Sequence, residues 1–175
     1  MVSAVKKRKE GNHTLKKIEK FAVIGGDMRQ LVAARELSAH GIHTVIYGFD
    51  IYDGNYGSIT KCASLAEALR GADCVLLPLP YSYDGVRLNC PLTGEELRVM
   101  DILSQADENA VIFTGKAPTV TDGRIVDYYA REEFSVLNAI PTAEGAIEAA
   151  MKHTSVTLHG TPCLVLGFGR IGKVL

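Results

Sequence analysis

A glycine-rich segment near the end of the chain carries the clearest chemical signal in the sequence. Residues 167–172 read Gly-Phe-Gly-Arg-Ile-Gly, which matches the spacing GxGxxG, and they follow an apolar run at 163–166. In this pattern the first glycine allows a tight turn, the second lets the backbone approach a pyrophosphate, and the third lets a helix pack closely on the preceding strand. The alternative is a glycine-rich turn without a ligand. The predicted dinucleotide-binding residues are Gly167, Phe168, Gly169, Arg170, Ile171 and Gly172.

The same motif does not identify the cofactor completely. The acidic residue that contacts the ribose of NAD is expected about 20 residues after the glycines. That position lies beyond Leu175, the last residue. We therefore expect NAD or NADP as the cofactor, and the sequence does not distinguish the two. We also expect this chain to bind no dinucleotide and to catalyse no reaction by itself, because half of the predicted site would lie outside it.

A second glycine turn, at residues 25–30, carries polar groups in place of the fingerprint. It reads Gly-Gly-Asp-Met-Arg-Gln, so Asp27 stands where the second glycine belongs and Gln30 where the third does. A carboxylate there would repel a pyrophosphate, whereas Arg29 could pair bidentately with a substrate carboxylate. The alternatives are a helix cap for Asp27 and a surface ion pair for Arg29. We place Asp27, Arg29 and Gln30 among the predicted substrate-binding residues.

Two further polar groups lie at positions where ligand sites are common. Thr114 and Lys116 follow the apolar run at 110–113, and Lys116 could neutralise an anionic substrate or transfer a proton. Asn138, Thr142 and Glu144 lie where the chain is expected to pass between domains. An exposed loop lysine and simple helix capping are the alternatives. All five residues belong to the predicted substrate-binding set, and Lys116 is also the catalytic candidate.

Other chemistries find little support. The five histidines are scattered, and none lies at the spacing from Asp, Glu or Cys that a metal site or a catalytic triad requires. The four cysteines form no CxxC pair, so we expect reduced thiols in a cytoplasmic protein. Neither a P-loop nor a GxSxG motif is present. We therefore predict no metal site.

Composition limits the possible partners. The chain has 175 residues, of which 47% are hydrophobic and 22% charged, as in soluble globular proteins. No apolar run approaches the roughly 20 residues that span a bilayer, so we predict no membrane association. The net charge is −1, but residues 1–20 hold seven basic and two acidic groups. Because no aromatic residue is interleaved with these lysines, we predict a basic tail and no nucleic-acid partner.

Alternating apolar and amphipathic segments predict the elements that position these groups. We expect strands at 21–24, 43–48, 74–79, 110–113 and 134–137, and helices at 28–38, 64–70, 95–104 and 123–131. This alternation is typical of an α/β fold with a doubly wound, Rossmann- or flavodoxin-like open parallel sheet. We expect the flavodoxin-like strand order. The polar groups that follow the strands would then meet at the carboxyl edge of the sheet, where such folds bind ligands.

The last part of the chain departs from this alternation. Pro141 and Thr142 predict the start of a helix, and 155–175 contain only one further strand, at 163–166, before the glycine turn. One strand cannot build a core. We therefore predict a basic tail at 1–17, a substrate-side α/β domain at 18–140 and a connecting helix at 141–154. Residues 155–175 would open a second, truncated, dinucleotide-binding Rossmann domain.

Three stretches together resemble the A subunit of dipicolinate synthase from endospore-forming bacteria. They are Ala-Val-Ile-Gly-Gly-Asp-Met-Arg-Gln at 22–30, Asn-Ala-Ile-Pro-Thr-Ala-Glu-Gly at 138–145, and His-Gly at 159–160 followed by Val-Leu-Gly-Phe-Gly-Arg-Ile-Gly at 165–172. The resemblance extends over about residues 20–175, in the family's order and spacing. The basic extension at 1–17 departs from the family pattern.

The resemblance implies an oxidoreductase of the lysine/diaminopimelate branch. It would convert dihydrodipicolinate, or its hydrated precursor, to dipicolinate with NAD(P) during sporulation, in the cytoplasm of the mother cell. It also implies a small dicarboxylate substrate and, as partner, the B subunit of dipicolinate synthase, and we expect a homo-oligomer. The layout is similar to 2-hydroxyacid and alanine dehydrogenases. Since the product is a dianion, the cleft needs basic groups, for which Arg29 and Lys116 are the candidates.

Two other functions stay open at this point. One is a different two-domain dehydrogenase that acts on a 2-oxo or 2-hydroxy acid or an amino acid, with a histidine and an arginine supplied by its nucleotide domain. The other is a non-catalytic assembly module that recruits the B subunit. Binding of the B subunit that is unaffected by nucleotide would indicate the assembly module.

Overall fold

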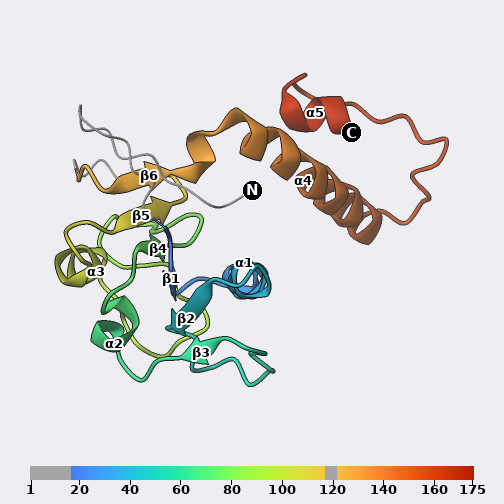
Figure 1. The fold of residues 1–175 in the computed structure, drawn as a ribbon. Coiled ribbons are helices and arrows are strands. Elements are labelled where there is room, and N and C mark those ends of the chain that lie inside the picture. The colour runs from blue at the N-terminus through green and yellow to red at the C-terminus, as the bar shows by residue number, and fades with distance from the viewer. Residues whose placement is uncertain (1–16, 117–121) are drawn as a thin grey trace. The chain divides into compact units, whose positions relative to one another are not determined.

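The computed structural model describes residues 17–116 and 122–175. The chain divides into two compact units, one ending at Tyr128 and the other comprising residues from Tyr129 to Leu175. Figure 1 shows the first unit as a sheet covered by short helices, and the second as one long helix with a short helix beside it.

The first unit is built on a six-stranded parallel sheet (Figure 1). Its strands are β1 (Lys20–Ile24), β2 (His43–Tyr47), β3 (Thr60–Lys61), β4 (Cys74–Leu76), β5 (Val111–Thr114) and β6 (Ile125–Asp127). The order across the sheet is β3-β2-β1-β4-β5-β6, the arrangement of Rossmann folds. Without the two-residue edge strand β3 the order is flavodoxin-like. The predicted α/β class and parallel sheet are therefore confirmed, and β3 adds an edge that the sequence pattern did not predict.

Helices cover both faces of this sheet (Figure 1). Helix α1 (Met28–Ala39) packs on one face, where Val23 and Leu31 belong to one buried cluster. Helices α2 (Leu65–Leu69) and α3 (Val99–Gln105) cover the other face, where Ile24 and Ile102 belong to a second cluster. Successive residues of a strand point to opposite faces, so an unbroken apolar run such as 21–24 supplies both clusters. The core of the first unit therefore lies on both faces of the sheet.

Most of the elements predicted for residues 20–114 are confirmed with small shifts at their ends. The strand predicted at 74–79 ends at Leu76, and the helix predicted at 95–104 begins only at Val99. Ser64 caps α2 as expected, since its Oγ accepts a hydrogen bond from the backbone N–H of Glu67 at 3.2 Å. The segment between β4 and α3, residues 77–98, is a long connection on the carboxyl side of the sheet.

Two predictions between residues 123 and 137 are wrong. The segment 123–131, predicted as a helix, contains strand β6 and the 3₁₀ turn η1 (Tyr128–Ala130). Tertiary contacts explain the difference. Arg124 donates from Nη2 to the carbonyl of Leu103 (2.7 Å), and its own carbonyl accepts from the N–H of Ile112 (2.9 Å). These bonds fix an extended chain beside β5, overriding local helix preference.

The predicted strand at 134–137 lies inside α4 (Glu132–His153), the main element of the second unit. This helix begins well before Pro141, so the predicted helix start at Pro141, with Thr142 as its cap, is also wrong. Pro141 lies in the helix interior, where it has no N–H to donate to the carbonyl one turn earlier. The hydroxyl of Thr142 donates to the carbonyl of Asn138 at 2.7 Å, a side-chain bond within the same turn.

The second helix of this unit is α5 (Arg170–Val174), which packs against α4 (Figure 1). Ala139 and Ala143, one turn apart on α4, are its buried residues. Residues 163–166, predicted as a strand, form no strand. A strand needs a neighbour to complete its ladder of hydrogen bonds, and none is supplied by the described residues of this unit. The division of the chain into domains with boundaries at 140 and 154 stays a prediction.

Candidate functional site

A pocket in the second unit brings together two groups of predicted residues. Its volume is about 340 Å³, within the roughly 300–1,000 Å³ of small-ligand sites. It is lined by Tyr129, Ser135, Asn138, Ala139, Thr142, Leu166, Gly167, Gly169, Arg170, Ile171 and Gly172. Asn138 and Thr142, which we predicted to bind substrate, therefore share a site with most of the predicted dinucleotide fingerprint.

The three glycines of this turn are present for different structural reasons. Gly167 adopts a φ of 106°, where a side chain would be strained. A Cβ on Gly172 would collide with the carbonyl oxygen of Gly167. Gly169 has an ordinary φ of −79°, and a Cβ there would meet no atom within 4 Å. The described chain thus explains the first and third glycines but not the second, whose open flank is where the fingerprint expects a pyrophosphate.

Some polar side chains of the pocket already form hydrogen bonds within the chain, and others do not. The hydroxyl of Ser135 donates to the carbonyl of Tyr129 at 3.3 Å, and that of Thr142 donates to the carbonyl of Asn138. The carboxamide of Asn138 forms no hydrogen bond with any residue that the structure describes. Asn138 is exposed on α4 and lines the pocket, so the two N–H donors and the carbonyl acceptor of its side chain are available to a ligand.

An ion pair connects the glycine turn to the start of α4. Arg170 donates from Nε to Glu132 at 3.0 Å, and its Nη2 pairs with the second carboxylate oxygen. The hydrogen bond from Arg170 lowers the pKa of Glu132 and raises that of Arg170. Because both side chains are exposed, the pair contributes little stability. The ion pair matters because it holds the guanidinium of Arg170 beside the pocket.

Sequence reasoning missed Tyr129, Glu132 and Ser135 because it assigned residues 123–131 to one helix and 134–137 to a strand, and did not predict that α4 begins at Glu132. A usable signal was present. Glu132 and Glu133 stand together in the first turn of α4, and Lys152 and His153 in its last turn, the charge pattern that complements a helix dipole.

The first glycine turn has a different role for its polar residues. The carboxylate of Asp27 accepts a hydrogen bond from the backbone N–H of Arg29 at 2.9 Å, and the side chain of Gln30 accepts one from the N–H of Asp27 at 3.1 Å. This reciprocal arrangement is a capping box at the start of α1. Gln30 is 5% exposed. Both side chains are engaged in capping, and their role in substrate binding stays a prediction.

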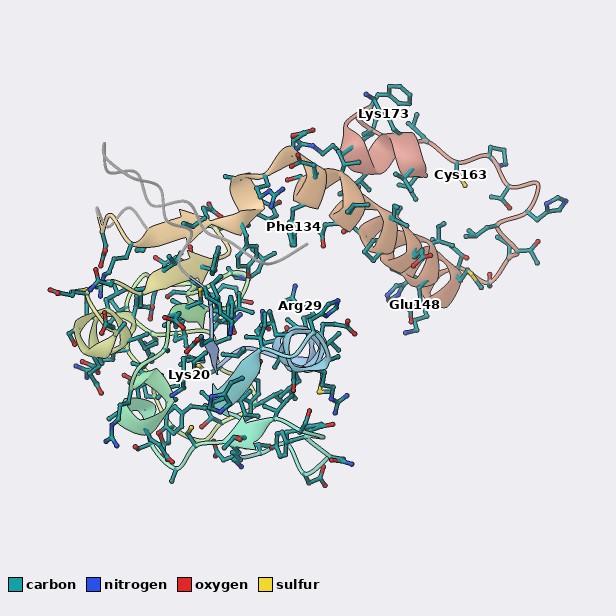
Figure 2. The ribbon with its side chains drawn as sticks, in the orientation of Figure 1. Lys20, Arg29, Phe134, Glu148, Cys163 and Lys173 are labelled. Carbon is teal, nitrogen blue, oxygen red and sulfur yellow. The ribbon has the colours of Figure 1, made fainter. Side chains whose placement is uncertain are left out.

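Arg29 lies in the first turn of α1 (Figure 2), and its side chain has two hydrogen-bond partners. Its Nε and Nη2 donate to the carboxylate of Asp27, and Nη2 also donates to the carbonyl of Leu79 at 2.7 Å. The hydrogen bond lowers the pKa of Asp27 and raises that of Arg29. The bidentate partner of Arg29 is thus Asp27. Its Nη1 makes no hydrogen bond with any described residue, and the side chain is 59% exposed, so one face can still meet an anion.

The connection between β4 and α3 fills the space beside the first glycine turn. A Cβ on Gly25 would lie 2.8 Å from a methyl group of Leu88 and would collide with the sulfur of Cys90. Burial raises the pKa of the Cys90 thiol to about 11, so this group stays a neutral packing element. Gly25 is therefore required by the packing of the chain itself, and no room is left there for a pyrophosphate.

The same connection also engages the acidic residue after β2. In a dinucleotide-binding Rossmann fold, an acidic residue near this position contacts the ribose. Here Asp50 accepts from the backbone N–H of Gly94 at 3.1 Å, and Glu95 accepts from the hydroxyl of Tyr47. That hydrogen bond raises the pKa of Tyr47 to about 12. The first unit thus has a Rossmann strand order. In the place where such folds bind a dinucleotide, however, it holds residues of its own connection between β4 and α3.

Thr114 and Lys116 lie at the carboxyl end of β5, as predicted. Thr114 is 1% exposed, and its hydroxyl has no partner among the described residues. Lys116 is exposed, with its backbone N–H donating to Asp127 at 3.2 Å. Tyr128, which sequence reasoning missed, donates its hydroxyl to the carbonyl of Leu77 at 3.2 Å. Burial raises the pKa of Tyr128 to about 12, and the nearby charge of Arg29 acts in the opposite direction.

The remaining predicted residues lie outside the pocket. Glu144 is exposed on α4, and Phe168 is 79% exposed beside Lys173. Within residues 17–116 and 122–175, no cluster of His, Cys, Asp and Glu could hold a metal ion. None of the helices described there is long and apolar enough to cross a membrane.

Comparison with known proteins finds similarity to A subunits of dipicolinate synthase. Residues 20–129 match the family described as the N-terminal domain of the dipicolinate synthase A subunit. The A subunit of dipicolinate synthase from Bacillus subtilis (strain 168) is 30% identical over 164 residues, covering 89% of this chain and 55% of that protein. The chain thus spans about half the length of this relative.

Two crystal structures carry the same fold. The A subunit of dipicolinate synthase from Bacillus halodurans has a TM-score of 0.73 at 28% identity, covering 89% of this chain and 56% of that one. The dipicolinate synthase A chain from Bacillus subtilis has a TM-score of 0.70 at 30% identity, covering 90% and 56%. Since the family match includes more than half of the chain and these structures share its fold, the chain belongs to the family of dipicolinate synthase A subunits.

Proposed function

We propose that the intact protein is the oxidoreductase subunit of a dipicolinate synthase. It would convert dihydrodipicolinate, or its hydrated precursor, to dipicolinate with NAD or NADP during spore formation. The observation that carries the proposal is the open flank of Gly169, which faces a pocket containing Arg170 and the unengaged carboxamide of Asn138. The names of the relatives support the choice of reaction.

The proposed reaction is a two-electron oxidation. Dihydrodipicolinate loses one hydride and one proton, and its ring becomes aromatic; the hydrated precursor first loses water. The nicotinamide, when bound, supplies the hydride acceptor. Because aromatisation drives the reaction, the protein mainly has to hold the substrate's C–H bond toward the acceptor and let the proton leave to water or a nearby base. No residue is assigned as that base, although Lys116 stays the candidate.

The substrate is a dicarboxylate, which calls for cationic groups. Arg29 and Lys116 both lie at the carboxyl edge of the parallel sheet, where open α/β folds bind ligands. The free Nη1 of Arg29 suits a single contact to a carboxylate oxygen, because the bidentate edge of the guanidinium is already paired with Asp27. We infer that these two side chains form the anion-binding part of the substrate site.

The proposed assembly is drawn from the family. The relatives are described as A subunits, which supports the presence of a second kind of subunit. We propose that this partner is the B subunit of dipicolinate synthase. We further propose a homo-oligomer in the cytoplasm of the mother cell of a sporulating bacterium. In this setting the small dicarboxylate is the diffusing substrate, and neither nucleic acid nor a membrane takes part.

The test uses the intact protein together with the B subunit. Freshly prepared dihydrodipicolinate is supplied with NAD or NADP, and dipicolinate and reduced nicotinamide are measured together. The proposal predicts that both rise in a one-to-one ratio. Dipicolinate without reduced nicotinamide would indicate another acceptor, such as a flavin. Neither product above the blank would reject the reaction and favour the assembly module.

A further inference from the structure

We propose that Asn138 binds the dinucleotide and not the dicarboxylate substrate. This inference rests on the proposed function, because it requires a dinucleotide at the glycine turn. It also revises the assignment that spacing alone indicates, in which Asn138, Thr142 and Glu144 form one substrate-binding group. The structure separates them, since Asn138 and Thr142 line the pocket and Glu144 does not.

The first step of the argument is location. The pocket that Asn138 lines also contains Gly167, Gly169 and Arg170, and all of them belong to one compact unit. The backbone of such a turn is where a pyrophosphate binds. Asn138 lines the same pocket of about 340 Å³, so its side chain is close to the place where those phosphates, or the ribose attached to them, would bind.

The second step is hydrogen-bonding capacity. The hydroxyls of Ser135 and Thr142 already donate to backbone carbonyls, and the guanidinium of Arg170 is paired with Glu132. The carboxamide of Asn138 and the Nη1 of Arg170 form no hydrogen bond with the described residues. An amide Nδ2 is a donor suited to phosphate or ribose oxygens, and an uncharged one avoids the desolvation cost of a second cation.

The third step is the position of the anion-binding residues. Arg29 and Lys116, the cationic candidates for the dicarboxylate, come from the first unit, at the ends of structures built on its parallel sheet. Asn138 and the glycine turn come from the second unit. The chemistry of the two units is therefore divided, with the dicarboxylate assigned to the first and the dinucleotide to the second.

The test measures binding of NADH and of NADPH to the intact protein by the fluorescence of the reduced nicotinamide. We expect Asn138→Ala to raise the Kd of the dinucleotide about tenfold and Asn138→Asp to raise it further, because a carboxylate repels phosphate. The control Ala149→Asp places the same charge on an exposed position of α4 outside the pocket and should leave the Kd unchanged. At saturating cofactor, the KM for dihydrodipicolinate should stay within about twofold of wild type in Asn138→Ala.

The outcomes separate the two proposals. If the wild-type protein binds dinucleotide and Asn138→Ala binds it equally well, the inference is wrong while the proposed function stands. An increase in the KM for dihydrodipicolinate with an unchanged dinucleotide Kd would return Asn138 to the substrate. If the wild-type protein binds neither NADH nor NADPH, the proposed function fails, and this inference fails with it. Because Asn138 is exposed, the variants should keep the wild-type circular dichroism spectrum and Tm.

Discussion

The chain contains two glycine turns, each followed by a helix, and they use their glycines differently. At residues 25–30, the space beside Gly25 is filled by Leu88 and Cys90, and the next polar residues cap α1. At residues 167–172, Gly167 and Gly172 satisfy the geometry of the turn, but the flank of Gly169 is open. A glycine that its own chain requires is evidence about folding. Gly169 is not required by its own chain, and its place as the second glycine of a GxGxxG turn is what makes a ligand the expected reason for it.

The difference also shows that a strand order does not by itself establish the function usually associated with it. The first unit has the β3-β2-β1-β4-β5-β6 order of nucleotide-binding folds. Its connection between β4 and α3 nevertheless packs on the first glycine turn and on Asp50 after β2. In the function that we propose, the first unit therefore uses the edge around Arg29 to bind an anion and does not bind the dinucleotide.

The largest expected effect is on folding, at the first turn. Gly25→Ala should lower the free energy of unfolding by about 3 kcal/mol, since the new Cβ combines a left-handed backbone with a collision against Leu88 and Cys90. The matched control is Gly71→Ala, where φ is +66° but no atom lies within 4 Å. It should cost only about 1 kcal/mol. Urea unfolding followed by circular dichroism measures both variants, and equal losses would show that the packing beside Gly25 is not tight.

The next effect is on binding, at the second turn. Gly169→Ala should leave the free energy of unfolding within about 0.5 kcal/mol of wild type, because its Cβ meets no atom. In the intact protein it should weaken NADH or NADPH binding at least tenfold, about 1.4 kcal/mol, by keeping a pyrophosphate away from the backbone. Isothermal titration calorimetry and urea unfolding separate the two effects. Loss of stability without loss of binding would reverse the assignment of this glycine.

The smallest effect tests the ion pair at the first turn. The pKa of Asp27 is lowered by its hydrogen bond with Arg29, so the pair stabilises the folded protein above the ordinary carboxyl pKa, and this stabilisation is lost as the pH falls. Asp27→Asn keeps a capping side chain and should cost only about 0.5 kcal/mol at pH 7, since both side chains are partly exposed.

Urea unfolding of both proteins at several pH values checks this sign. The difference between wild type and Asp27→Asn should shrink as the pH falls below about 4. A difference that grows on acidification would contradict the paired geometry of Asp27 and Arg29.

Sequence patterns were sufficient for the elements whose packing is local. The apolar runs at 21–24 and 43–48 and the capping residues Asp27 and Ser64 predict β1, β2, α1 and α2 closely. Patterns failed where distant contacts decide. The hydrogen bonds of Arg124 with Leu103 and Ile112 hold the chain beside β5, where a helix was predicted and β6 forms. Pro141 misled for a local reason, because proline is common in the first turn of a helix but here lies inside a longer one.

The candidate site was predicted only in part for the same reason. The fingerprint at 167–172 was visible because its spacing is local. The shared pocket was not, because Asn138 and Gly169 are brought together by the packing of α5 on α4. The sequence likewise could not predict that Leu88 and Cys90 fill the space beside Gly25, because no local pattern relates residues so far apart in the chain.

The most direct test of the different roles of the two turns is hydrogen–deuterium exchange of the intact protein with and without NADH or NADPH. Our account predicts slower amide exchange at residues 167–172 and around Asn138 when dinucleotide is bound. It predicts unchanged exchange at residues 25–30, where the chain already fills the space. Protection at 25–30 with no change at 167–172 would contradict it, because the dinucleotide would then occupy the turn that we assign to folding.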